Sequence, residues 1–276
     1  MTFSFHRRYT GMIQAVIFDW AGTTVDHGCL APMVAFIESF KAQGVEITVE
    51  EARIHMGLPK RAHIAGLLEL PMVRARWQAT HKTAPTETDI QRIYDYFIPR
   101  QAAIVGDYAD PIPGTPELMT ELRNRGIKIG SCTGYNREIM AVLVPRALER
   151  GYNPDATITP DTVGGGRPGP WMALQNAIAL QVYPMEAIIK VGDTIADIEE
   201  GLNAGMWTVG VARTGNELGL SAEEVAALSD EVLLKRLDPI YSRFKRAGAH
   251  YVIDSITELI PVIEDINDHL VRGERP

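Results

Sequence analysis

The chain has 276 residues, of which 46% are hydrophobic and 22% charged, and its formal net charge at pH 7 is −8. This is the composition of a globular protein that can bury a sizeable core, and no apolar run approaches the length needed to cross a bilayer. Because lysines and arginines are scattered over an acidic chain, the sequence argues against nucleic-acid binding, which requires a basic face.

The start of the chain and its cysteines bear on location. Residues 1–11 show neither a long apolar stretch nor a small-residue cleavage site, so we expect a short extension there. The chain has two cysteines, Cys29 and Cys132, which form neither a disulfide framework nor a CxxC metal pair. These features favour a reducing, cytoplasmic location.

The first predicted strand covers residues 13–18, an apolar and β-branched run that stops at Asp19. Similar runs predict four further strands, at residues 127–132, 187–191, 207–211 and 250–254. Helical patterns lie between them, at residues 116–125, 136–149, 171–180 and 195–204. Strands that alternate with helices predict an α/β fold with a Rossmann-like parallel sheet, covered by helices on both faces.

Residues 29–100 interrupt this alternation with several helix-like segments and no convincing strand. A capping-box pattern begins at Thr48, Pro59 suits the first turn of a helix, and Thr86 resembles another helix cap. A second irregular stretch, residues 213–248, is expected to be a loop with one or two short helices. We therefore expect a small helical cap domain at 29–100, inserted into a core domain formed by residues 1–28 and 101–276.

Polar residues gather where the predicted strands end, which is where ligands bind in an open parallel sheet. These residues, including those of a glycine-rich loop, are Asp19, Thr133, Gly134, Arg167, Asp193 and Asp197. Each alone has an ordinary explanation as a turn residue, a helix cap or a solvated cation. Together they offer a nucleophile, hard oxygen ligands for Mg²⁺ and donors for phosphoryl oxygens, so they favour phosphoryl transfer with Asp19 as the nucleophile.

These motifs resemble those of the haloacid dehalogenase-like superfamily of phosphohydrolases, over nearly the whole chain and including the inserted cap. Phosphatases of that superfamily usually have Asp-x-Asp in the first motif, where the second Asp protonates the leaving oxygen. Here Ala21 stands in that place. Hydrolysis of an ordinary ester would therefore lack a general acid that is typically worth about 10²–10⁴-fold in rate.

Cleavage of a carbon–phosphorus bond does not need that acid, because the leaving atom is carbon. The developing carbanion is stabilised if a lysine forms an imine with a neighbouring carbonyl group. Lys60, at a predicted helix start in the insert, is the candidate, although a lysine considered alone is more often a surface cation. His63 lies on the same helical face and is interpreted equally well as a proton relay or as a packed helix residue.

Four segments are similar to the phosphonoacetaldehyde hydrolase family, the Schiff-base branch of this superfamily. They are Asp-Trp-Ala-Gly-Thr-Thr at 19–24, Met-Gly-x-x-Lys at 56–60, Cys-Thr-Gly-Tyr at 132–135 and Gly-Arg-Pro-x-Pro-Trp-Met at 166–172. The resemblance implies hydrolysis of phosphonoacetaldehyde to acetaldehyde and phosphate. It further implies an aspartyl-phosphate on Asp19 and an imine on Lys60, whose pKa must be lowered for the amine to attack.

The resemblance also implies the roles of the surrounding residues. Mg²⁺ would be held by Asp19, Asp193 and the backbone carbonyl of Ala21, and phosphoryl oxygens by Thr133, the Gly134 amide and Arg167. Asp197 would orient metal-bound water or Arg167. The aldehyde pocket would be lined by Met56, Cys29 and Tyr135, although core packing explains Met and Cys equally well. A homodimer joined through the cap domains is also implied.

Two other functions remain open at this point. A phosphomonoesterase or sugar-phosphate mutase would need the acid that Ala21 replaces. An inactive phosphometabolite-binding module would not need the nucleophile Asp19, which the chain retains.

Overall fold

The structure, a computed structural model, describes residues 8–276, so residues 1–7 of the expected extension lie outside the described part. Six parallel strands form one sheet in the order β3-β2-β1-β4-β5-β6. These strands are β1 (Ala15–Phe18), β2 (Lys128–Cys132), β3 (Ala156–Ile158), β4 (Ile188–Gly192), β5 (Trp207–Val211) and β6 (Tyr251–Ile253). The predicted α/β fold with a parallel sheet is confirmed.

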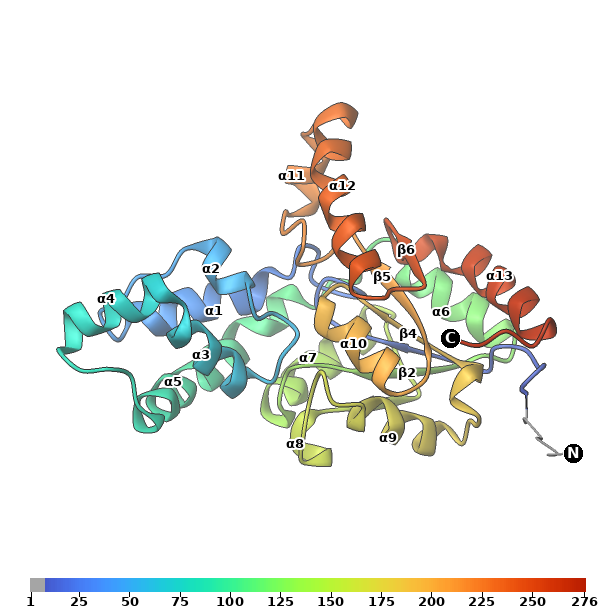
Figure 1. Ribbon diagram of the computed structural model, residues 1–276, viewed down its shortest axis with the longest axis horizontal. Coiled ribbons are helices and arrows are strands. Elements are labelled where there is room, and N and C mark those ends of the chain that lie inside the picture. The colour runs from blue at the N-terminus through green and yellow to red at the C-terminus, as the bar shows by residue number, and fades with distance from the viewer. Residues whose placement is uncertain (1–7) are drawn as a thin grey trace, which may run out of the picture.

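The core helices are α6 (Thr115–Asn124), α7 (Arg137–Glu149), α8 (Pro160–Val163), α9 (Trp171–Leu180), α10 (Ile195–Asn203), α11 (Ala222–Ala226), α12 (Asp230–Arg246) and α13 (Leu259–Val271), with single 3-10 turns η1 (Gly106–Tyr108), η2 (Met185–Ala187) and η3 (Ile256–Glu258). Val16 and Phe18 pack with α6 and α13 on one face of the sheet (Figure 1). Ala15 and Ile17 point the other way and pack with α9. No helix in the described part of the chain combines the length and apolarity needed to cross a membrane.

The insert after β1 consists of helices α1 (Leu30–Lys41), α2 (Val49–Arg53), α3 (Lys60–Glu69), α4 (Pro71–His81) and α5 (Glu87–Val105), which form a separate lobe in Figure 1. Thr48 and Thr86 both form capping boxes, so both predicted caps are confirmed. Pro59 immediately precedes α3 and does not lie in its first turn. The predicted boundary at residue 100 falls within α5, which continues as one helix into the core.

Two expectations differ from the structure. β3 does not appear in the sequence pattern because it has only three residues, all half-buried, and therefore lacks an apolar run. The stretch 213–248 contains more than short helices, because α12 is 17 residues long and projects from the core in Figure 1. Pro239 and many charged residues mask its apolar stripe, whose buried members are Leu233, Leu237, Ile240 and Phe244.

Candidate functional site

The side chains that follow three neighbouring strands meet at the carboxyl edge of the sheet. β1 pairs with β2 on one side and β4 on the other, and β2 and β4 each end one residue beyond the partner of the last residue of β1. Asp19 follows β1, Thr133 follows β2 and Asp193 follows β4. All three line one small cavity together with Gly134 and Arg167. The sequence-predicted residues of the phosphoryl site therefore lie together.

Three buried carboxylates form the acidic part of the site. Asp19, Asp193 and Asp197 each place an oxygen within 4.8 Å of the others. Burial raises the pKa of Asp19 despite the opposing charge of Arg167, and burial with the charge of Asp19 raises the pKa of Asp193 well above its ordinary value. Burial would also raise the pKa of Asp197, but Arg167 and Lys190 outweigh it and keep this pKa below its ordinary value.

Arg167 is the cation at the centre of this cluster. Its Nη2 lies 2.6 Å from Asp19 Oδ1 and 3.0 Å from Asp197 Oδ1, and its Nε donates to Glu200 Oε2 at 2.9 Å. Nη2 also donates to the Cys132 carbonyl oxygen at 3.1 Å. These contacts fix the guanidinium beside the nucleophile candidate, where it can bind an oxygen of a phosphoryl group.

Lys190 and Glu200 belong to the same network, although the sequence interpretation misses both. Lys190 Nζ lies 2.5 Å from Asp197 Oδ1 and 3.6 Å from Glu200 Oε2. The side chains of Lys190 and Glu200 are fully buried. A lysine inside the apolar run of β4 was the available signal, because lysine is almost never fully buried unless it is paired. Glu200 lies one helical turn beyond Asp197 on α10, and so on the same face.

The charges of the site fit a divalent cation. Asp193 accepts hydrogen bonds from Thr23 Oγ1 at 3.1 Å and from the Asn216 amide at 2.7 Å, but it makes no ion pair with any described residue. With Lys60 neutral, the four buried carboxylates Asp19, Asp193, Asp197 and Glu200 outnumber the two buried cations Arg167 and Lys190, which leaves −2 when all six are charged. A divalent cation bound by these carboxylate oxygens would balance that charge.

Lys60 enters the same cavity from the insert. It is the first residue of α3, and only 4% of its surface is exposed. Its Nζ lies 4.8 Å from the ring centre of Tyr135 and 5.4 Å from that of Phe36, and no described residue accepts a hydrogen bond from it. Burial lowers the pKa of Lys60 to about 8, with Arg167 also lowering it and the nearby acidic groups opposing the shift.

His63 lies behind Lys60, outside the residues that line the cavity. Its Nε2 donates to the Ala52 carbonyl oxygen at 2.9 Å, and its ring packs at 3.9 Å from the ring of Phe36. Burial and the charge of Lys60 keep the pKa of His63 well below its ordinary value, so the ring is neutral. Its Nδ1 is buried and has no partner among the described residues.

The insert closes directly over the strand ends. An added Cβ at Gly57 would lie 2.4 Å from Thr194 Oγ1, and one at Gly134 would lie 2.7 Å from the Leu58 carbonyl oxygen. Gly57 also has φ of +90°, which L side chains rarely adopt. Small residues therefore let the segment before Lys60 touch the core backbone. The space left between the insert and the core is only about 20 Å³, room for about one water molecule.

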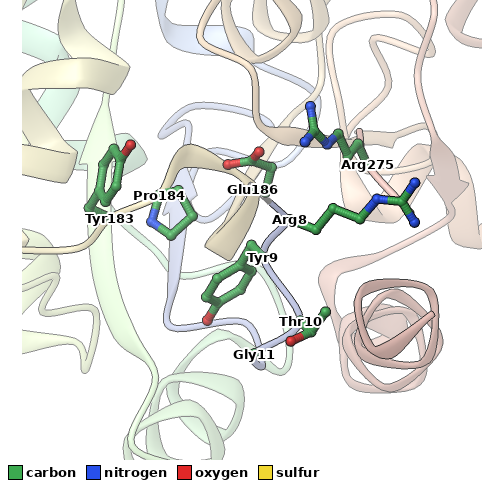
Figure 2. A pocket seen from close by; sticks show the side chains of 8 residues that line it. All are labelled: Arg8, Tyr9, Thr10, Gly11, Tyr183, Pro184, Glu186 and Arg275. Carbon is green, nitrogen blue, oxygen red and sulfur yellow. The ribbon is translucent and has the colours of Figure 1, made fainter. Parts of the chain in front are cut away.

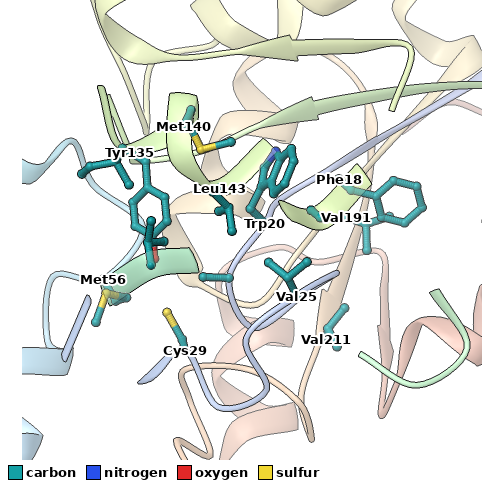
Figure 3. Close-up of a cluster of buried hydrophobic side chains, with 14 of the residues drawn as sticks. Phe18, Trp20, Val25, Cys29, Met56, Tyr135, Met140, Leu143, Val191 and Val211 are labelled. Atoms are coloured by element: carbon teal, nitrogen blue, oxygen red, sulfur yellow. The ribbon is translucent and has the colours of Figure 1, made fainter. Parts of the chain in front are cut away.

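The three residues that the resemblance implies for the aldehyde pocket all line this cavity. Met56, Cys29 and Tyr135 lie against it, and Figure 3 shows them at the edge of a larger apolar cluster. Ala21 also lines the cavity, beside Asp19. The hydroxyl of Tyr135 is buried with no hydrogen-bond partner among the described residues, so it is available to a ligand.

A larger hollow of about 380 Å³ lies at the opposite edge of the sheet (Figure 2). It is formed by the segments that precede β1 and β4 and by the C-terminal end of the chain, so no strand-end residue reaches it. The residues that line it are Arg8, Tyr9, Thr10, Gly11, Tyr183, Pro184, Glu186 and Arg275.

Comparison with known proteins agrees with this geometry. Residues 13–205 match the haloacid dehalogenase-like hydrolase family. The chain is 52% identical to a phosphonoacetaldehyde hydrolase of Bacillus cytotoxicus, over 92% of this chain and 96% of the relative. It is 48% identical to a phosphonoacetaldehyde hydrolase-like protein of Syntrophobacter fumaroxidans, over 99% of both chains.

Solved structures give the same picture. A crystal structure of a phosphonoacetaldehyde hydrolase-like protein from Oleispira antarctica superimposes with a TM-score of 0.98 at 44% identity, over 100% of both chains. A β-phosphoglucomutase from Clostridium difficile shares only 19% identity at a TM-score of 0.67, over 95% of this chain and 100% of that one. That second similarity is one of fold alone.

Proposed function

We propose that this chain, which belongs to the haloacid dehalogenase-like hydrolases and within them to the phosphonoacetaldehyde hydrolase family, cleaves phosphonoacetaldehyde to acetaldehyde and phosphate. The observation that carries the proposal is the pairing of two groups in one closed cavity. A buried amine of lowered pKa, Lys60, faces a site that offers a buried carboxylate, Asp19. Ala21 in place of the usual second acid fits a leaving group that is carbon.

Lys60 activates the substrate in the first step. Its neutral amine attacks the aldehyde carbon, and loss of water gives a protonated imine. The aromatic surfaces of Tyr135 and Phe36 stabilise the cationic imine through their ring faces. The unpartnered hydroxyl of Tyr135 is placed to hydrogen-bond the carbonyl oxygen or the water that leaves. Closure of the insert keeps bulk water from hydrolysing the imine early.

Asp19 then attacks phosphorus. The carbon–phosphorus bond breaks, and its electron pair passes through the adjacent carbon into the iminium group, which becomes an enamine. Protonation of the enamine carbon and hydrolysis of the resulting imine release acetaldehyde and restore Lys60. Water then hydrolyses the aspartyl-phosphate and releases phosphate. The atom that leaves phosphorus is carbon and not an ester oxygen, so this step does not need the acid that Ala21 replaces.

Several residues hold the phosphoryl group in this scheme. Arg167 offers donors beside Asp19, and Thr133 and Gly134 line the same cavity. We assign a bound Mg²⁺ to Asp19, Asp193 and the carbonyl oxygen of Ala21. When bound, the ion neutralises the carboxylates and the phosphoryl charge.

Asp197 and His63 support the site without lining it. Asp197 bonds Arg167 and Lys190, so its role is to orient the guanidinium. His63 ties the first turn of α3 to α2 through the Ala52 carbonyl oxygen, and because its pKa is well below the ordinary value we assign it a packing role. Met56 and Cys29 shape the apolar wall of the aldehyde pocket.

We further propose that residues 29–100 act as the cap, that the protein is a homodimer joined through its caps, and that it is cytoplasmic. Exposed apolar side chains on the insert, among them Met72 and Ile54, favour a cap-to-cap contact. Two unpaired buried cysteines suit a reducing compartment. A light-scattering mass equal to that of one chain would exclude the dimer. Recovery of the protein outside the cytoplasmic fraction of its cells would contradict the proposed location.

The rate is expected to rise with pH through about 8. Lys60 must be neutral to attack, and it is protonated below its pKa of about 8. The value of kcat/KM should therefore fall roughly tenfold for each pH unit below 8 and level off above it. Steady-state assays from pH 6 to 9 provide the measurement. A profile that is flat or falls across this range would contradict a neutral amine nucleophile.

The substrate assignment is tested by phosphate release from two compounds in parallel. Phosphonoacetaldehyde should be turned over with Mg²⁺ present, while p-nitrophenyl phosphate should react at least about 10²-fold more slowly, because its oxygen leaving group needs the missing acid. A chelator should abolish turnover, and added Mg²⁺ should restore it. Faster release from p-nitrophenyl phosphate would indicate a phosphomonoesterase, and no release from either compound would indicate a binding module.

A further inference from the structure

One arginine of the insert is bonded almost entirely to the core. Arg53, the last residue of α2, donates from Nη1 to the Gly28 carbonyl oxygen at 2.9 Å and to Asn216 Oδ1 at 3.0 Å. Its Nη2 donates to the Gly219 carbonyl oxygen at 3.0 Å. Gly28 lies in the linker that leads into the insert, whereas Asn216 and Gly219 lie in the core loop after β5. One guanidinium therefore joins insert, linker and core.

Other arginines of the insert behave differently. Arg92 bonds Asp89 and Gln43, and all three residues lie in the insert. In contrast, the acceptors of Arg53 are backbone carbonyls and one amide oxygen outside α2. Its hydrogen bonds therefore depend on the insert lying against the core.

The core loop that receives Arg53 also holds the acidic cluster. The backbone amide of Asn216 donates to Asp193 Oδ2 at 2.7 Å. Two residues earlier, Thr214 Oγ1 donates to the Gly22 carbonyl oxygen at 2.9 Å. An added Cβ at Gly215, the residue between them, would lie only 2.3 Å from Asp193 Cβ, so the loop and the Asp193 side chain are in tight contact. Movement of this loop would move a carboxylate of the cation site.

We infer that Arg53 is a positioning residue that couples closure of the insert to the orientation of Asp193. In the closed form its hydrogen bonds to Asn216 and Gly219 fix the loop, and with it the Asn216 backbone amide that holds Asp193 Oδ2. When the lobes separate, Arg53 leaves Asn216 and Gly219, and the loop loses this restraint. Enclosure of the substrate and assembly of the cation site thus occur together. The inference rests on the proposed function where it treats Asp193 as a cation ligand.

Closure can be measured without any enzymatic assay, by alkylation of the two cysteines. Cys29 lines the cavity between the lobes, so it becomes accessible when they separate. Cys132 is fully buried in β2, so it reports loosening of the whole core. The rates of iodoacetamide labelling at each cysteine are read by peptide mass spectrometry in the full-length protein.

Arg53→Ala is expected to accelerate labelling of Cys29 by about tenfold or more, because losing several charge-assisted hydrogen bonds favours the open form. Labelling of Cys132 should change less than about twofold, and Arg92→Ala should behave as wild type. Loss of the positive charge cannot cause the acceleration, because Arg53 lowers the pKa of the Cys29 thiol. Its removal would raise that pKa and slow the reaction.

Asn216→Ala provides a second variant, since it removes one of the two acceptors in the core loop and leaves Arg53 intact. This variant should also accelerate labelling of Cys29. The double variant, Arg53→Ala with Asn216→Ala, should be labelled at Cys29 no faster than Arg53→Ala alone. Calorimetric titration with Mg²⁺ should show affinity about tenfold weaker in Arg53→Ala than in wild type or Arg92→Ala.

Unchanged labelling of Cys29, or equal acceleration at both cysteines, would overturn the inference, as would unchanged Mg²⁺ affinity. These outcomes do not depend on the substrate. If labelling and affinity change as expected while phosphonoacetaldehyde is not cleaved, the coupling stands and the proposed function fails.

Discussion

Replacing Lys60 by methionine is expected to lower kcat for phosphonoacetaldehyde by at least about 10⁴-fold. Methionine keeps an unbranched apolar chain against Tyr135 and Phe36 but cannot form an imine. Without an iminium group, the electron pair of the carbon–phosphorus bond has no acceptor. Steady-state phosphate release provides the measurement, with circular dichroism to confirm folding.

Two further lysine variants sharpen this result. Lys60→Arg restores a positive charge but no nucleophilic amine, so it should be as inactive as the methionine variant. Lys82→Arg changes an exposed lysine of the insert and should keep wild-type activity. If Lys60→Arg retained more than about a tenth of wild-type activity, Lys60 would act only through its charge and the imine would be excluded.

Asp19→Asn is expected to reduce phosphate release by at least about 10⁴-fold while leaving imine formation intact. Asparagine has nearly the same shape but is not a nucleophile toward phosphorus. Because Lys60 remains, borohydride should still trap the aldehyde on the enzyme, with the phosphonate group attached. Intact-protein mass spectrometry distinguishes this adduct from the phosphorus-free adduct expected in wild type.

The surface variant Asp238→Asn serves as the matched control and should behave as wild type. Retention of phosphate release in Asp19→Asn within about tenfold of wild type would assign the nucleophile elsewhere. Loss of the trapped adduct in the same variant would mean that imine formation already requires Asp19, against the order of steps proposed above.

Much of the core could be predicted because parallel strands are buried on both faces. The apolar runs that precede Asp19 and Asp193 therefore mark β1 and β4 directly. The site follows from these runs, since the carboxyl ends of neighbouring parallel strands meet at one edge. The sequence also shows Ala21 in the place of the usual second Asp, and this substitution favours cleavage of a carbon–phosphorus bond.

The features that the sequence does not predict depend on contacts between segments that are far apart in the chain. Lys190 pairs with Asp197 and Glu200 only after α10 packs on β4, and no local pattern specifies that contact. Arg53 is an ordinary residue at the end of a short helix until the linker and the loop after β5 come together around it. The lowered pKa of Lys60 likewise arises from burial by both lobes.

Borohydride reduction of the wild-type enzyme during turnover tests directly whether an imine forms on Lys60. Peptide mass spectrometry should find a two-carbon adduct on Lys60, absent when either the substrate or the reductant is omitted. Turnover of phosphonoacetaldehyde with no adduct on any lysine, or with the adduct on a lysine outside the cavity, would contradict the account.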